Sequence, residues 1–158
     1  MTNRQIERAA VALAKHVLET EGYAVTVEGG GYDLKAQKDG DEIHVEVKGA
    51  GKTVSGTGGF RYMTDGEFRA ARQDVKWQPW IVENLSDGTS VTLTRIARDE
   101  VIANSVMEIS WMIKIGGWCR ERREPVAEET CAKVLSGVTA HSARAARATD
   151  TAEGGCAT

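Results

Sequence analysis

The sequence has little cysteine, only two prolines and no long apolar run. The three cysteines, Cys119, Cys131 and Cys156, are widely spaced in the last third of the 158 residues, so neither a C-x-x-C pair nor a disulfide framework can be assembled. The most apolar stretch, Ser105 to Trp118, is interrupted by charged residues and falls short of the roughly 20 apolar residues that cross a bilayer. These absences exclude a disulfide-stapled protein and predict no membrane-spanning helix.

The chain also lacks a strong excess of charge and an apolar leader. It has 20 Lys+Arg against 23 Asp+Glu, a net charge of −3 that argues against coating nucleic acid through charge alone. Six basic and three acidic residues nevertheless lie between Lys48 and Lys76, so positive charge is concentrated there. The polar beginning of the sequence has no secretory h-region, and we expect a cytoplasmic protein with no membrane contact.

The spacing of apolar residues predicts an α/β fold with a central mixed β-sheet flanked by helices. Ile6, Ala10, Leu13 and Val17 recur at helical spacing, whereas Ile43, Val45 and Val47 alternate as in a strand. The expected elements are a helix over 3–20, strands near 23–27, 32–37 and 42–48, a helix from Asp65 to about Val75, strands over 80–85 and 90–96, and a last strand over 107–115. The second helix is preceded by Thr64-Asp65-Gly66-Glu67, which has the spacing of a capping box.

The pattern changes after Trp118. Residues 119–158 contain six basic and six acidic residues and almost no large apolar side chain after Leu135. We therefore expect one folded domain over residues 1–118 and a loosely structured tail over 119–158, helical near 127–138, that mild proteolysis removes.

Three residues form the most chemically suggestive group. Glu46 and Lys48 share one face of the strand over 42–48, and antiparallel pairing can bring Asp33 beside them. Paired carboxylates suit a hard divalent cation such as Mg²⁺, and a neighbouring lysine can position or deprotonate water and offset phosphate charge. These are the groups that metal-dependent hydrolysis of a phosphodiester requires.

A simpler interpretation is that these residues are the solvent-facing charges of a half-buried hairpin, because such strands alternate in this way. His44 lies on the same face, but a lone histidine on a strand is more often a hydrogen-bonded bystander. We leave His44 out of the predicted site.

The order of the motifs favours the chemical interpretation. Gly31-Tyr32-Asp33-Leu34 and then Val45-Glu46-Val47-Lys48-Gly49 stand where the PD-(D/E)xK, or restriction-endonuclease-like, nuclease superfamily has its Asp and its Glu-x-Lys. Residues 4 to 116 resemble a narrower branch, the nuclease-like domain at the C-terminus of the plant protein NO VEIN. That resemblance includes the segment from Phe60 through Glu67, the helix with Ala70-Ala71-Arg72, and Trp80-Ile81-Val82-Glu83-Asn84.

The resemblance implies a role for each site residue. Asp33 and Glu46 would hold Mg²⁺, with Mn²⁺ as a substitute, the Val47 carbonyl would be a third ligand, and Lys48 would be the catalytic lysine. Glu7 matches an acidic position that only some members use.

The function that follows is a Mg²⁺-dependent endonuclease that hydrolyses DNA phosphodiester bonds in bacterial restriction or related defence. DNA is the expected partner, together with a helicase or restriction-system protein, and a homodimer is one of the assemblies left open. Lys52, Arg61, Arg69 and Arg72 are candidates for phosphate contact, although exposed helix faces carry such charges by default. The alternative function is a catalytically silent module that keeps the fold for nucleic-acid binding or protein assembly.

Overall fold

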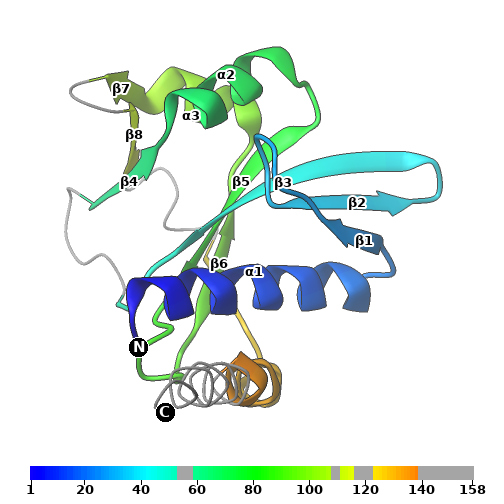
Figure 1. The fold of residues 1–158 in the computed structure, drawn as a ribbon, viewed down its shortest axis with the longest axis vertical. Coiled ribbons are helices and arrows are strands. Elements are labelled where there is room, and N and C mark those ends of the chain that lie inside the picture. Colours follow the sequence, from blue (N-terminus) through cyan, green and yellow to red (C-terminus); the bar gives the residue numbers. More distant parts are fainter. Residues whose placement is uncertain (53–58, 108–110, 116–122, 139–158) are drawn as a thin grey trace, which may run out of the picture.

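The computed structural model describes residues 1–52, 59–107, 111–115 and 123–138. Figure 1 shows the arrangement of the helices and strands. In chain order they are α1 (Asn3–Thr20), β1 (Ala24–Val27), β2 (Leu34–Lys38), β3 (Asp41–Gly49), β4 (Gly59–Met63), α2 (Asp65–Gln73), β5 (Trp77–Glu83), β6 (Thr92–Arg95), α3 (Arg98–Asn104), β7 (Ser105–Met107), β8 (Trp111–Ile115) and β9 (Arg123–Pro125). Residues 128–138 are helical as well.

The strands form two sheets. The larger has the order β1-β2-β3-β5-β6-β9, and the smaller has the order β4-β8-β7. Within the larger sheet, β3 and β5 are parallel and every other neighbouring pair is antiparallel. The chain passes from β3 to β5 through β4 and α2, so α2 belongs to the crossover that parallel strands require.

Helices cover both faces of the larger sheet, and β5 shows how the faces are divided. Its Trp80 and Val82 pack in the core that contains the apolar side of α1, whereas its Trp77 and Ile81 pack with Phe68 of α2. This alternation follows from the period of two in a strand. The predicted α/β class, with a mixed sheet flanked by helices, is confirmed.

Two expectations about the strands need correction. The strand expected over 80–85 begins earlier, since β5 starts at Trp77 and contains Pro79. The missing N–H of Pro79 lies at the end of the β5–β6 ladder, where the Pro79 carbonyl still accepts a hydrogen bond from the Ile96 N–H at 3.1 Å, one residue before Trp80 opposite Arg95. The single last strand expected over 107–115 is instead two strands, since β7 and β8 pair antiparallel with each other.

Residues 123–138 do not fit the loose tail expected for 119–158. β9 pairs with β6 at the edge of the larger sheet, and Cys131 on the following helix is only 1% exposed. Val134 and Leu135 pack against the same core as α1. The helix expected near 127–138 is present, and this part of the predicted tail belongs to the packed core. Residues 119–122 and 139–158 lie outside the described residues.

None of the helices in the described part of the chain is long and apolar enough to cross a membrane.

Candidate active site

A cleft of about 590 Å³ lies where α1, β3 and the start of α2 approach the loop before β2. Asp33, Glu46, Val47 and Lys48 all line this cleft, as does Glu7. The structure therefore brings together the predicted metal ligands, the predicted catalytic lysine and the acidic residue of the first helix.

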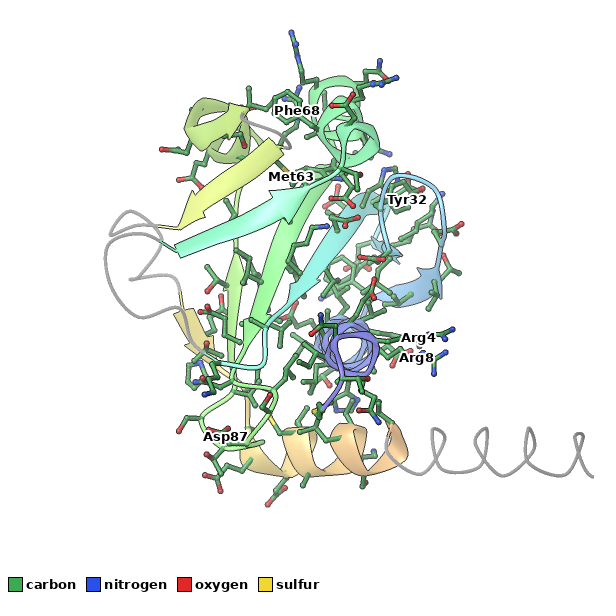
Figure 2. The ribbon with its side chains drawn as sticks, turned by 60° about the vertical axis from the view of Figure 1, so that its left-hand side comes forward. Arg4, Arg8, Tyr32, Met63, Phe68 and Asp87 are labelled. Atoms are coloured by element: carbon green, nitrogen blue, oxygen red, sulfur yellow. The ribbon has the colours of Figure 1, made fainter. Side chains whose placement is uncertain are left out.

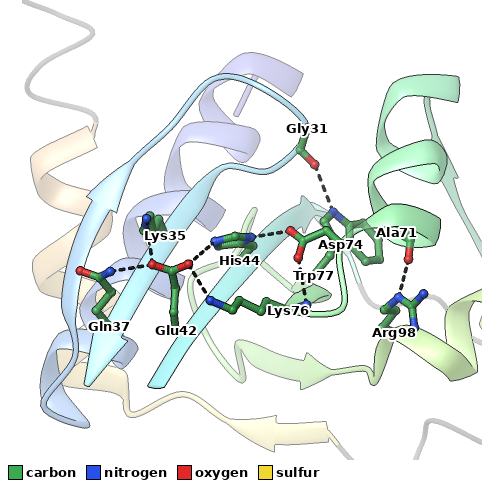
Figure 3. Close-up of polar contacts among 10 residues, drawn as sticks. All are labelled: Gly31, Lys35, Gln37, Glu42, His44, Ala71, Asp74, Lys76, Trp77 and Arg98. Atoms are coloured by element: carbon green, nitrogen blue, oxygen red, sulfur yellow. Dashed lines mark hydrogen bonds and ion pairs between the residues drawn. The ribbon is translucent and has the colours of Figure 1, made fainter. Parts of the chain in front are cut away.

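Two glycines allow the backbone to form the cleft. Gly49 lies directly beneath α1, where an added Cβ atom would sit 3.0 Å from the Ile6 carbonyl oxygen. Gly31 has a φ of 90°, a backbone conformation that residues with a side chain rarely adopt. Its carbonyl accepts a hydrogen bond from Trp77 Nε1 at 3.1 Å (Figure 3). This bond fixes the loop two residues before Asp33.

Asp33 is held at the end of the β2–β3 hairpin by two hydrogen bonds to the backbone of β3. Its N–H donates to the Val45 carbonyl at 3.0 Å, and its carboxylate Oδ2 accepts from the Val47 N–H at 2.8 Å. A residue in a strand directs its N–H and its carbonyl to the same side, so the Val47 carbonyl faces the side of β3 on which Asp33 lies.

Glu46 and Lys48 point to the same face of β3, as their spacing predicted. Lys48 Nζ donates to Glu46 Oε1 at 2.8 Å. The Glu46 residue is 6% exposed, so this is a buried carboxylate and not the solvent-facing charge of the simpler interpretation. The side chain of Lys48 is 18% exposed and reaches the cleft.

Glu67 is a site residue that the sequence analysis did not identify. Its Oε2 accepts from Lys48 Nζ at 2.6 Å, so Lys48 is held between Glu46 and Glu67. The same oxygen caps α2 by accepting from the Thr64 N–H at 3.2 Å. A signal was present in the sequence, because the helix that crosses over after a parallel strand begins near the carboxyl end of that strand. The capping-box glutamate is thereby placed beside Lys48.

Burial and the neighbouring charges shift the pKa values of these groups. Burial raises the pKa of Glu46 to about 7; Lys48 opposes the shift, and Asp33 and Glu67 add to it. Burial also raises the pKa of Asp33, against the hydrogen bond from Val47. Burial lowers the pKa of Lys48, but Glu46 and Glu67 more than offset this and the net direction is upward. Lys48 is therefore a cation at neutral pH.

The donor set of the cleft fits one hard cation that keeps part of its water. Among the described residues, no group of three or more His, Cys, Asp or Glu side chains is arranged to hold a metal. The hydrogen bonds described above use Asp33 Oδ2 and Glu46 Oε1, so each carboxylate has a second oxygen that those bonds do not use. Neither residue has a buried side-chain oxygen that lacks a hydrogen-bond partner. Two carboxylates and a backbone carbonyl are a suitable set for Mg²⁺, which is bound by few protein ligands and several waters.

His44 lies outside this group, as expected, and belongs to a separate network (Figure 3). Its Nε2 is 3.1 Å from Glu42 Oε1, its Nδ1 contacts Asp74, and its ring stacks on Tyr32 with centroids 4.3 Å apart. Glu42 also accepts from Lys76 at 3.0 Å, and Lys35, Lys76 and Gln37 hold the pKa of its carboxyl well below the usual value. This network stabilises the β2–β3 hairpin and the start of β5.

The residues predicted to contact phosphate are not gathered in the cleft. Lys52 is exposed and follows Gly51, which lines the cleft. Arg69 and Arg72 are exposed on α2, and Arg69 pairs with Asp65 at 3.2 Å. Arg61 lies on β4, and its side chain is outside the described part. Contact of these four residues with nucleic acid stays a prediction.

The fold and the cleft define an α/β domain in which two carboxylates and a lysine converge at the end of a β-hairpin. Residues 6–95 match the family described as Protein NO VEIN, C-terminal, and the chain therefore belongs to this family. The matched range covers more than half of the chain and contains Asp33, Glu46, Lys48 and Glu67. No curated protein and no solved structure matches the chain.

Proposed function

We propose that this protein is a Mg²⁺-dependent nuclease that hydrolyses phosphodiester bonds of DNA, in restriction or a related defence role in bacteria. One observation carries the proposal. Lys48 Nζ lies 2.8 Å from Glu46 Oε1 in a cleft that Asp33 also lines, and these are the three positions of the PD-(D/E)xK pattern that the family resemblance predicts. Membership of the family supports the same reading over residues 6–95.

Asp33, Glu46 and the Val47 carbonyl would hold the cation. When bound, Mg²⁺ would stabilise the charge that develops on the phosphate and make a bound water more acidic. Asp33 and Glu46 would keep the cation beside the hairpin, and the hydrogen bond from the Val47 N–H fixes the orientation of the Asp33 carboxylate. Burial makes the charged forms of both acids unfavourable without a counter-charge, which favours binding of a cation.

Lys48 acts on the water and the phosphate rather than on the cation. Its raised pKa keeps the ammonium charged, so it can donate hydrogen bonds to the attacking water and to a phosphate oxygen, and can offset negative charge in the transition state. Glu46 and Glu67 fix the position of Nζ from two sides. This pre-arranged donor is the feature that a silent module would have no need to keep.

The first experiment is incubation of the purified protein with plasmid and with labelled oligonucleotides in Mg²⁺, Mn²⁺ or EDTA. Nicking or cutting in Mg²⁺ or Mn²⁺, and none in EDTA, is the expected result. Lys48→Ala, purified in parallel, controls for contaminating nucleases, and Lys38→Gln controls for loss of a positive charge far from the cleft. If no metal supports cleavage of any substrate, the silent module becomes the better description.

A further inference from the structure

The exposed face of α1 carries two arginines beside the cleft. Arg4 and Arg8 lie one helical turn apart and extend from the same side of the helix (Figure 2). Both are exposed, and no ion pair joins either of them to another described residue. By contrast, Lys15 on the same helix pairs with Glu19, and Arg69 on α2 pairs with Asp65.

A groove of about 420 Å³ connects these arginines to the candidate active site. Arg4, Arg8 and Lys15 line it together with Glu7 and Asp33, and the last two also line the cleft. A molecule bound in the cleft can therefore continue over Asp33 onto this side of α1. The groove is therefore mixed in charge: α1 contributes three basic residues and Glu7, and Asp33 comes from the loop before β2.

Helix stability does not explain Arg4. The N-terminal turn of a helix favours acidic side chains, and α2 and α3 both have them there, namely Asp65, Glu67, Asp99 and Glu100. The first turn of α1 has no acidic residue and contains Arg4 instead. Positions that break a local rule of stability are expected at functional surfaces.

We propose that Arg4 and Arg8 bind the sugar–phosphate backbone of a DNA duplex whose cleaved strand lies in the adjacent cleft, an inference that rests on the proposed function. The two Cα atoms are separated by about 6 Å along the helix axis. A strand of DNA carries one charge per roughly 3.4 Å of axis, so both guanidinium groups can contact phosphates of one strand. Guanidinium groups without a protein partner are free to make the bidentate contacts that phosphates accept.

The salt dependence of DNA binding tests this surface. We would measure the anisotropy of a labelled DNA duplex in EDTA, where it is not cut, between about 50 and 200 mM salt. Relative to wild type, the Arg4→Ala/Arg8→Ala variant should bind at least about tenfold more weakly at the lower salt concentration. Its slope of log K against log salt should be smaller by about 2, or roughly 0.9 per lost phosphate contact. Lys38 of β2 lies against the Glu21 carbonyl at the far end of α1, about 20 Å along the helix axis from Arg8, so Lys38→Gln should leave both quantities unchanged.

A second variant separates loss of the surface from loss of the fold. Arg4→Glu places an acid in the first turn of α1, so its melting temperature should equal or exceed that of wild type while its DNA binding weakens. An unchanged salt slope in the double variant, an equal loss in Lys38→Gln, or no DNA binding by wild type would each overturn the proposal. Arginine-dependent binding without cleavage in Mg²⁺ would leave this surface standing and remove the nuclease. Cleavage in Mg²⁺ together with DNA binding that does not depend on the two arginines would support the nuclease and overturn this surface.

Discussion

Glu46 is a carboxylate that the fold buries beside two other acids and one lysine. Burial, Asp33 and Glu67 oppose its charge, and Lys48 compensates for only part of that opposition. A buried group of this kind either takes up a proton or acquires a cation. We therefore expect the stability of the protein to respond to both pH and divalent metal through this residue.

In EDTA, the stability of the wild type should fall as the pH rises from about 4.5 to about 7. Burial raises the pKa of Glu46 to about 7 in the folded protein from its usual value of 4.5, so the folded state holds the proton more tightly across that interval. The lost stability is on the order of 3 kcal/mol, and Asp33 contributes in the same direction. Glu46→Gln, which cannot titrate, should show a much flatter profile in thermal melts. A wild-type stability that rises over this interval would contradict the burial of Glu46.

Metal should separate the roles of Glu46 and Lys48. Mg²⁺ or Mn²⁺ should raise the melting temperature of wild type, because a bound cation relieves the repulsion between the Asp33 and Glu46 carboxylates. Glu46→Ala should abolish the increase and leave the metal-free protein as stable as wild type or more so. Lys48→Ala should keep most of the increase, since the role proposed for the lysine is at the water and the phosphate. Calorimetric titration of Mn²⁺ into the three proteins is the measurement, and identical isotherms would remove the metal from this cleft.

At the scale of elements, Glu67 connects the N-terminal cap of α2 to Lys48 in the cleft. Glu67→Gln keeps an oxygen that can cap the helix but removes the charge that holds Lys48. We expect it to lower the cleavage rate by roughly 10-fold to 100-fold with little change in stability. Glu67→Ala should lower the rate similarly and also destabilise the protein by about 0.5–1 kcal/mol through the lost cap. If Glu67→Gln cleaves as fast as wild type, Glu67 is only a helix cap.

The local patterns predicted most of these elements because each depends on short-range periodicity. The alternation from Ile43 to Lys48 was enough to define β3 and to place Glu46 beside Lys48. Alternation could not reveal that β7 and β8 pair with each other, because the sequence from Met107 to Ile115 shows one continuous alternating pattern. The pairing of Glu67 with Lys48 depends on the crossover between β3 and β5, which is a tertiary contact.

At the scale of the whole molecule, residues 123–138 complete the core that the first helix begins. Their sequence is weakly apolar, so composition alone suggested a loose tail, but Cys131 reaches the core beneath α1. Ala9 and Ala10 of α1 belong to the same core, and small side chains let neighbouring elements approach closely, so few large side chains are needed there. The sequence could not show this because α1, which forms part of the partner surface, lies more than a hundred residues earlier in the chain.

A pair of matched substitutions tests this packing. Cys131→Asp places a carboxylate in the core and should destabilise the protein by at least about 3 kcal/mol. Ala132→Asp places the same carboxylate on the exposed side of the same helix and should destabilise the protein by less than about 1 kcal/mol. Denaturant unfolding of both variants is the measurement. Equal, small effects would show that residues 123–138 are a loose tail after all.

The measurement that tests the central claim most directly is the single-turnover rate of DNA cleavage by wild type and Lys48→Ala in saturating Mg²⁺. If the cleft is a metal-dependent nuclease site, Lys48→Ala should cleave at least about 100-fold more slowly, in the range that positioned proton-transfer and charge-stabilising groups contribute. Lys38→Gln should cleave at the wild-type rate. Equal rates for wild type and Lys48→Ala, or no metal-dependent cleavage by wild type, would contradict the assignment.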